Sequence, residues 1–145
     1  MKVLQLPSHF TPTHETAGLP GFPAVDVFAP SWTPVAAPVD GHVVKLSGRR
    51  LPGGPWNPWN RAGATYPGET RHPPGGPLGW TLYIADDDGV YFVTHLGQVA
   101  RRLWRVGAPV RRGSYLGKVA PYLELTGGVT PSHVHEGFHA GAWQP

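Results

Sequence analysis

The sequence predicts an all-β domain, built mainly from antiparallel strands joined by long loops. Its 20 glycines and 18 prolines work against long helices and favour short strands with ordered turns. Every segment with strand-like periodicity is short and is followed by a turn signal. In addition, 40% of the residues are hydrophobic and 11% are aromatic, which is too much for a disordered chain.

Length and composition indicate one domain without disulfides. A chain of 145 residues can bury a sizeable core, and we expect an N-terminal arm over residues 1–12 and a single domain over residues 13–145. The apolar start ends at Pro7, which is too early for a signal peptide or a membrane-spanning helix. Because cysteine is absent from the sequence, histidine and carboxylate side chains would have to hold any zinc.

The first apolar segment, residues 24–28, contains one carboxylate, Asp26. Burying an unpaired charge is costly, so Asp26 needs a partner, which is either a metal ion or a set of hydrogen-bond donors. Further along, a short strand, a turn at residues 40–41 and a second strand over residues 43–46 predict a hairpin. We expect His42, beside this turn, to be exposed.

The stretch from residue 49 to residue 79 holds much of the Gly and Pro and shows no periodicity. A loop of this length inside a small domain is usually functional or disordered, and its aromatic residues argue against disorder. Trp56, Trp59 and Tyr66 are candidate substrate-binding residues that would line a groove for peptide or sugar. Packing of these rings onto the sheet explains them equally well.

Sheet signals return after this loop. Residues 80–85 and 90–95 flank the acidic turn 86–89, which predicts a hairpin that ends at His95. The turn lacks the spacing of a calcium-binding EF-hand loop, and we interpret it as a solvated turn. Residues 98–119 predict another pair of short strands, broken at residues 107–109 and at Gly113.

Two histidines lie close together near the end of the chain. His133 and His135 are two positions apart, so in a strand they project from the same face, about 7 Å apart. One imidazole could bind zinc while the other acts as an acid or base on a water. The same spacing fits two histidines on a solvated strand, so the pair decides nothing alone. Glu136 should face away from His135, and we place it with His9 and His139 at the surface or behind the site.

The formal charge of +3 comes largely from arginines. Such a surface favours an anionic partner, such as nucleic acid or an acidic cell-wall polymer, or it is simply solvated. No nucleic-acid-binding motif accompanies the charge, so we expect no nucleic-acid partner.

Taken together, the ordered motifs resemble those of the lysostaphin-type (LytM-like) zinc metallopeptidases, which cleave peptidoglycan peptides. The resemblance runs from about residue 13 to residue 138 and implies a sheet related to barrel-sandwich hybrids. The motifs, besides His133-Val134-His135, are Val25-Asp26-Val27-Phe28-Ala29-Pro30, Thr33-Pro34-Val35, Gly41-His42-Val43-Val44, Tyr91-Phe92-Val93-Thr94-His95-Leu96, Val106-Gly107 and Leu116-Gly117.

The resemblance also implies roles for individual residues. Asp26 and His135 would bind zinc, while His95 and His133 would flank the water and the scissile carbonyl. The family's other zinc-binding histidine lies four residues before the Asp, where this chain has Phe22, which cannot bind a metal. His14, twelve residues before Asp26, is then the expected third ligand, provided that residues 18–21 fold the loop back.

The resemblance thus predicts a zinc metalloendopeptidase, a peptidoglycan hydrolase that acts on the bacterial cell wall. Without a signal peptide, such an enzyme would be delivered by a phage particle or released at lysis, as a phage lysin is. One alternative is a catalytically degenerate LytM-like module with a structural or wall-binding role, for instance in a phage virion. A biotinyl or lipoyl carrier domain fits less well, because Lys45 lies inside a predicted strand instead of at a hairpin tip.

Overall fold

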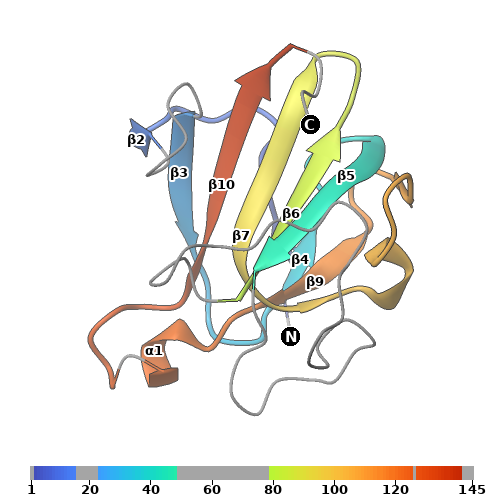
Figure 1. Cartoon of the computed structure of the whole chain (residues 1–145). Coiled ribbons are helices and arrows are strands. Elements are labelled where there is room, and N and C mark those ends of the chain that lie inside the picture. The colour runs from blue at the N-terminus through green and yellow to red at the C-terminus, as the bar shows by residue number, and fades with distance from the viewer. Residues whose placement is uncertain (1, 16–22, 49–78, 126, 142–145) are drawn as a thin grey trace.

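Strands make up most of the regular structure of this protein (Figure 1). The structure, a computed structural model, describes residues 2–15, 23–48, 79–125 and 127–141. The helical segments in these ranges are the 3₁₀ helix η1 (Arg101–Leu103) and the α-helix α1 (Tyr122–Leu125). The strands are β1 (Leu4–Gln5), β2 (His14–Glu15), β3 (Pro23–Phe28), β4 (Pro34–Ala36), β5 (Gly41–Gly48), β6 (Trp80–Ala85), β7 (Gly89–Val99), β8 (Pro109–Val110), β9 (Tyr115–Val119) and β10 (His133–Ala140).

The described strands belong to one ten-stranded sheet. Its main path runs β1-β4-β9-β7-β10-β3-β2, while β6 pairs with β7, β5 with β6, and β8 with β5. The pairs among these strands are antiparallel except for β1 and β4, which run parallel. The prediction of an all-β, mainly antiparallel fold is therefore confirmed.

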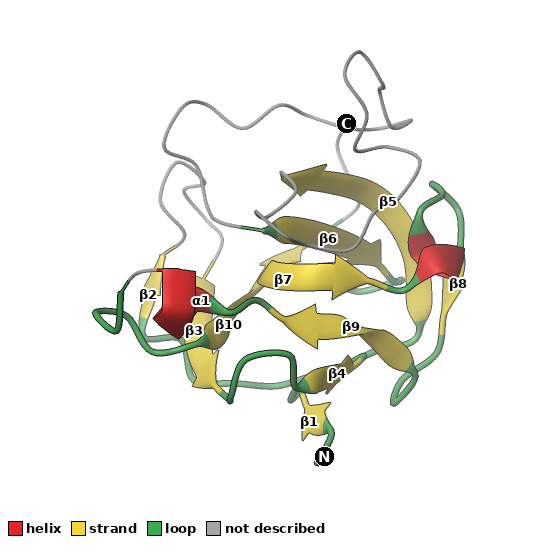
Figure 2. Ribbon diagram, turned by 90° about the horizontal axis from the view of Figure 1, so that it is seen from below, coloured by secondary structure: helices red, strands yellow, loops and turns green. Residues whose placement is uncertain are grey.

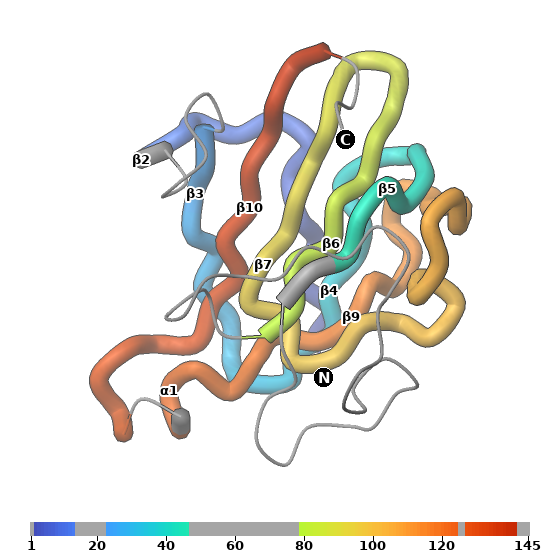
Figure 3. Tube along the Cα trace, in the orientation of Figure 1, coloured from blue at the N-terminus to red at the C-terminus, as the bar shows by residue number. Residues whose placement is uncertain are grey.

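The main core lies between two parts of this sheet. In Figures 1 and 3, β4 and β9 lie behind β10, β7, β6 and β5. Alternate side chains of the front strands point back into the core, and burying each large aliphatic side chain contributes about 1.5–3 kcal/mol. The opposite face of β7 and β10 carries the histidines of β10 beside a smaller hydrophobic cluster that includes Val90 and Phe92. Core side chains include Leu82, Val93 and Val134 from the front strands and Val35, Leu116 and Val119 from the back strands.

Strand β7 changes its neighbour partway along its length. Up to Thr94 it pairs with β10, and from Leu96 onward it pairs with β9. His95 lies at this change, and its φ of 67° is in the left-handed region that few non-glycine residues adopt. The sheet therefore opens between β9 and β10 beside His95. The connection between these two strands contains α1, which lies at this end of the sheet (Figure 2).

The predicted hairpin at the β6–β7 turn is confirmed, and the one over residues 31–48 is wrong. Strands β6 and β7 pair, and the Asp86 carboxylate accepts hydrogen bonds from the N–H groups of Asp88 and Gly89, which closes the turn. In contrast, β4 pairs with β1 and β9, whereas β5 pairs with β6 and β8. The segment between β4 and β5 is bound to the β8–β9 loop instead, because Asp40 Oδ1 accepts the N–H of Arg112 at 2.8 Å.

The N-terminal arm packs onto the sheet. Strand β1 pairs with β4, and Leu6 is buried in the main core. The Tyr91 hydroxyl donates a hydrogen bond to the carbonyl of Ser8, which fixes the arm against β7. Within the described ranges, no helix is long and apolar enough to cross a membrane.

Candidate active site

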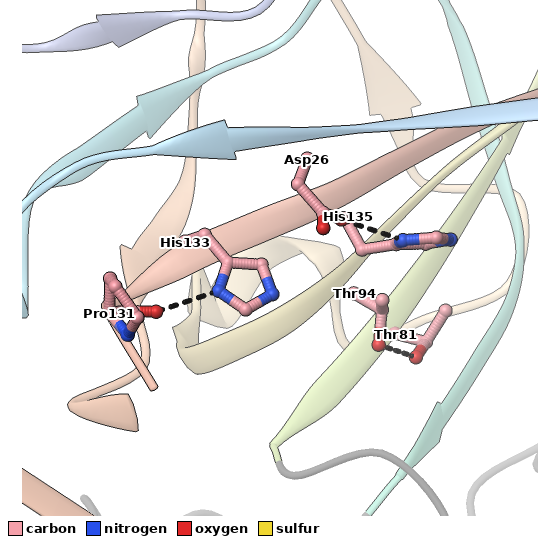
Figure 4. Close-up of polar contacts among 6 residues, drawn as sticks. All are labelled: Asp26, Thr81, Thr94, Pro131, His133 and His135. Atoms are coloured by element: carbon pink, nitrogen blue, oxygen red, sulfur yellow. Dashed lines mark hydrogen bonds and ion pairs between the residues drawn. The ribbon is translucent and has the colours of Figure 1, made fainter. Parts of the chain in front are cut away.

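The register of three strands brings one row of polar residues together. Strand β10 pairs with β3 so that His135 lies opposite Asp26, and with β7 so that His135 lies opposite Thr94. Side chains of directly opposed residues project from the same face of a sheet. The Thr94 hydroxyl is in turn hydrogen-bonded to that of Thr81 at 2.6 Å, in a buried position. Asp26, His135 and Thr94 thus form a row across β3, β10 and β7 (Figure 4).

Asp26 and His135 are hydrogen-bonded to each other and lie close enough to bind one metal ion together. Nδ1 of His135 lies 3.0 Å from Oδ1 of Asp26. Two donors that bind one tetrahedral zinc at about 2.0–2.1 Å are roughly 3.3 Å apart, so a small outward shift would admit the metal. The exposed side-chain fractions are 11% for His135 and 35% for Asp26, so the pair borders solvent. An imidazole and a carboxylate at this distance fit half of a zinc site.

The backbone of His14 lies in the strand next to the one that carries Asp26. Strand β2 pairs with β3 so that His14 lies opposite Ala24, two positions from Asp26. Strand β2 thus lies beside the strand that carries Asp26. The side chain of His14 and all of Phe22 lie outside the part of the chain that the structure describes. Among the side chains that are described, no three His, Cys, Asp or Glu residues form a metal-binding group.

His133 is oriented by a hydrogen bond to the backbone. Its Nδ1 lies 2.8 Å from the carbonyl oxygen of Pro131 (Figure 4). A carbonyl oxygen only accepts, so Nδ1 carries the proton. In a neutral imidazole the lone pair is then on Nε2, which is the atom that can take a proton from water.

His95 joins the two histidines of β10 from the neighbouring strand. Its ring centroid is 4.9 Å from that of His133, in an edge-to-face arrangement, and 6.5 Å from that of His135. The prediction grouped these residues by motif, and the structure brings the three imidazoles into one cluster. Their spacing allows one reacting group to contact more than one imidazole.

Three aromatic side chains that the sequence analysis did not single out surround the histidines. Tyr122 contacts both His95 and His133, and Phe28, which is 60% exposed, lies beside His133 with ring centroids 5.4 Å apart. Phe92 packs against His135 with ring centroids 5.6 Å apart. Hydrophobic alternation could have placed Phe28 and Phe92 on the same face as the histidines, but no sequence signal placed Tyr122 there.

Glu136 faces away from His135, as predicted, and it is buried behind the site, which excludes a position at the surface. It follows His135 directly and therefore points to the opposite face, into the core, where its exposed fraction is 0%. Neither carboxyl oxygen has a hydrogen-bond partner among the described residues. Burial raises the pKa of Glu136 to about 8, so the carboxyl is protonated at neutral pH.

The remaining candidate residues divide into those that are described and those that are not. His42 is exposed, as predicted, and so is His9, while His139 is partly buried. Lys45 lies inside β5 with its ammonium 4.7 Å from the Tyr83 ring centroid, so it is not at a hairpin tip, as a carrier domain would require. The predicted groove residues Trp56, Trp59 and Tyr66 lie outside the described ranges.

Known structures with a similar fold include two bacterial proteins. A point mutant of the catalytic domain of the prophage-encoded M23 protein EnpA from Enterococcus faecalis matches with a TM-score of 0.53 and 20% sequence identity. The match covers 97% of this chain and 88% of the EnpA domain. Csd3 from Helicobacter pylori matches with a TM-score of 0.53 and 20% identity, over 95% of this chain and 30% of Csd3.

No protein-family model matches this sequence, and no curated protein matches it. At 20% identity, the structural matches show the fold alone. That fold is the one of an M23 catalytic domain, in agreement with the fold implied by the LytM-like motifs.

Proposed function

We propose that this chain, which has the fold of an M23 catalytic domain, is a zinc-dependent endopeptidase that hydrolyses peptide cross-links of bacterial peptidoglycan. The observation that carries the proposal is the contact between Asp26 and His135 at 3.0 Å, with the imidazoles of His95 and His133 on the same side of the sheet. A carboxylate, several imidazoles and an open approach are the groups that a catalytic zinc site uses.

Asp26, His135 and His14 are the residues that would hold the metal. When bound, zinc supplies a Lewis acid for the scissile carbonyl and acidifies a water to a pKa of about 7. Strand pairing holds Asp26 and His135 opposite each other across β3 and β10, so only their mutual hydrogen bond has to give way to the metal. His14 would complete the set from β2, whose backbone lies beside β3.

His133 is suited to act as the general base. Its Nδ1–H is engaged by the carbonyl of Pro131, so Nε2 is free to accept a proton, and the ring cannot rotate without losing that hydrogen bond. His95, which belongs to β7, contacts the ring of His133. Its imidazole would stabilise the developing oxyanion or donate a proton to the leaving amine.

The second candidate function is a catalytically inactive module, and it is supported by an incomplete set of zinc ligands among the described side chains. Phe22 occupies the position that carries a zinc-binding histidine in the LytM-like pattern, and the described side chains include no complete set of three ligands. A chain in which His14 does not bind the metal would be a catalytically degenerate module with a structural or wall-binding role, for instance in a phage virion.

The proposed enzyme would be encoded by a phage and would act on the bacterial cell wall. The structurally similar EnpA domain comes from a prophage-encoded protein. A phage-encoded wall hydrolase would reach its substrate from a phage particle or at lysis, and Trp56, Trp59 and Tyr66 would line the groove for the peptide.

The test is the release of new amino groups from purified bacterial cell walls by zinc-loaded protein, with and without a chelator. We expect release that the chelator abolishes and that added zinc restores. The control is Asp26→Ala protein of the same concentration. Walls with several cross-link chemistries should be used, since absence of release from all of them by folded, zinc-loaded protein would favour the degenerate module.

A further inference from the structure

Three rings meet where β7 changes its neighbour. The Tyr122 ring lies edge to face with His95, at a centroid distance of 4.8 Å and an interplanar angle of 70°. The same ring lies 5.3 Å from the His133 ring, at 43°. Because the two imidazoles also contact each other at 4.9 Å, each ring of the three restricts the other two.

A chain of hydrogen bonds fixes α1, and with it Tyr122, at this place. Ser31 Oγ donates to Glu124 Oε2 at 2.6 Å, so the Ser31 hydroxyl proton is already used. Ser132 Oγ, 2.9 Å from Ser31 Oγ, must therefore donate to Ser31, and it accepts the N–H of Leu123 at 3.1 Å. The hydrogen bond from Ser31 also lowers the pKa of the Glu124 carboxyl below its usual range, which keeps the acceptor ionised. The chain links α1 to both the β3–β4 connection and the start of β10.

The imidazole of His95 needs such a support. The pairing of β7 with β10 ends at Thr94, and pairing with β9 begins at Leu96, so His95 lies between the two ladders. Its φ of 67° is a conformation that persists only where the surroundings enforce it. Tyr122 contacts the ring from the connection that spans the opening between β9 and β10.

We propose that Tyr122 is a positioning residue, which holds the imidazoles of His95 and His133 in one relative orientation because the Ser132–Ser31–Glu124 hydrogen bonds anchor α1. The catalytic roles of the two histidines come from the proposed function. The effect of Tyr122 on the orientation of the two imidazole rings can be tested whether or not the protein is an active enzyme.

The test compares four variants. Tyr122→Ala removes the ring, and Tyr122→Phe keeps the ring without the hydroxyl. Ser31→Ala breaks the hydrogen-bond chain but keeps the Tyr122 side chain, so it also tests the proposal if Tyr122→Ala folds poorly. Leu123→Ala, at a residue that is 41% exposed in the same helix, is the matched control.

The first measurement is the position of the histidine ring signals in nuclear magnetic resonance spectra of chelator-treated protein. Tyr122→Ala should move the signals of both His95 and His133, because it removes an aromatic ring next to each. Tyr122→Phe should restore them, Ser31→Ala should shift them partly, and Leu123→Ala should leave them in place. The exposed His42 is the internal reference and should not move in any variant.

The second measurement is the rate of amino-group release from cell walls, with bound zinc quantified in each sample. Tyr122→Ala should lower the maximal rate by about 10- to 100-fold, the loss typical of a misplaced catalytic group, with little change in the wall concentration at half-maximal rate. Zinc content should stay unchanged, and Tyr122→Phe should stay within about twofold of the original chain.

Unmoved His95 and His133 signals in folded Tyr122→Ala protein would overturn the proposal. So would a Tyr122→Phe variant as slow as Tyr122→Ala but with unmoved ring signals, because the hydroxyl would then act on the substrate directly. If the original chain releases nothing from any wall, the proposed function fails, while the ring signals still decide the role of Tyr122.

Discussion

Nδ1 of His135 and Oδ1 of Asp26 lie 3.0 Å apart because the two residues face each other across β10 and β3. If both bind zinc, as proposed, removal of either leaves at most two ligands. We expect His135→Ala and Asp26→Ala to lose zinc, and His42→Ala, at an exposed histidine of β5, to keep about one ion per chain. Elemental analysis of protein purified without a histidine tag measures this. Full zinc retention in both variants would exclude the proposed site.

His14→Ala tests the third ligand by itself. If His14 binds zinc, we expect zinc affinity to fall about as far as in Asp26→Ala, since each removes one directly bound donor. The measurement is competition with a chelator of known zinc affinity. His9→Ala, at an exposed histidine of the same N-terminal segment, is the matched control. Equal affinity in the His14 and His9 variants would move the third ligand to another residue.

His95 and His133 should support the rate and not the binding of zinc. We expect His133→Ala and His95→Asn to keep their metal and to lose about 10²–10⁴-fold in wall hydrolysis, the contribution typical of a positioned acid or base. Asn is chosen at position 95 because it tolerates the left-handed φ of 67° better than Ala does. Rates and zinc content should be measured on the same samples, and zinc loss in either variant would contradict the assignment.

Glu136 should make stability fall as the pH rises. Its pKa is about 8 in the folded chain and 4.5 in the absence of burial, so between these values the folded state binds more protons than the unfolded state. The free energy of unfolding should therefore decrease from about pH 4.5 to about pH 8, by on the order of 3–5 kcal/mol from this residue. The measurement is urea unfolding of chelator-treated protein across this range.

Glu136→Gln is the comparison for that experiment, because Gln has the same shape and no charge. We expect the difference between the two proteins to be small near pH 4.5, to grow in favour of the Gln variant up to about pH 8, and then to level off. A difference that does not change with pH would mean that the carboxyl does not titrate in the core.

Gly137 leaves room for the ring of Phe92, which packs against His135. A Cβ at this position would lie 2.1 Å from the Phe92 ring, and Phe92 is buried and contacts His135. We expect Gly137→Ala to destabilise the fold by about 1–3 kcal/mol through overpacking. The cost should shrink in a Phe92→Leu background, since the clash is with that ring. Thermal unfolding of the single and double variants measures the difference, and an unchanged cost would place the strain elsewhere.

Local patterns in the sequence were enough to predict the longer strands, such as β6 and the first half of β7, whereas the grouping of Asp26, His95, His133 and His135 came from the resemblance to LytM-like motifs. Strand alternation determines which side chains share a face, and that rule does not depend on distant residues. Pairing between strands does depend on them, which is why the hairpin over residues 31–48 was wrong although both strands exist.

The support around the histidines was beyond prediction for the same reason. Tyr122 lies in a four-residue helix with no periodicity to read, and its place depends on hydrogen bonds between Ser31, Ser132 and Glu124, which are far apart in the sequence. The burial of Glu136 was missed because alternation predicts its direction, but the depth of the core behind β10 depends on the whole sheet.

The order of the strands also bears on how the protein is made. Among the described strands, β3 joins the rest of the sheet through β10, although β10 is synthesised much later. Until β10 emerges from the ribosome, the segment with Asp26 has no neighbour on that side, and the two histidines of β10 do not yet exist. A nascent chain of this protein therefore cannot form the contact between Asp26 and His135 before synthesis has passed residue 135.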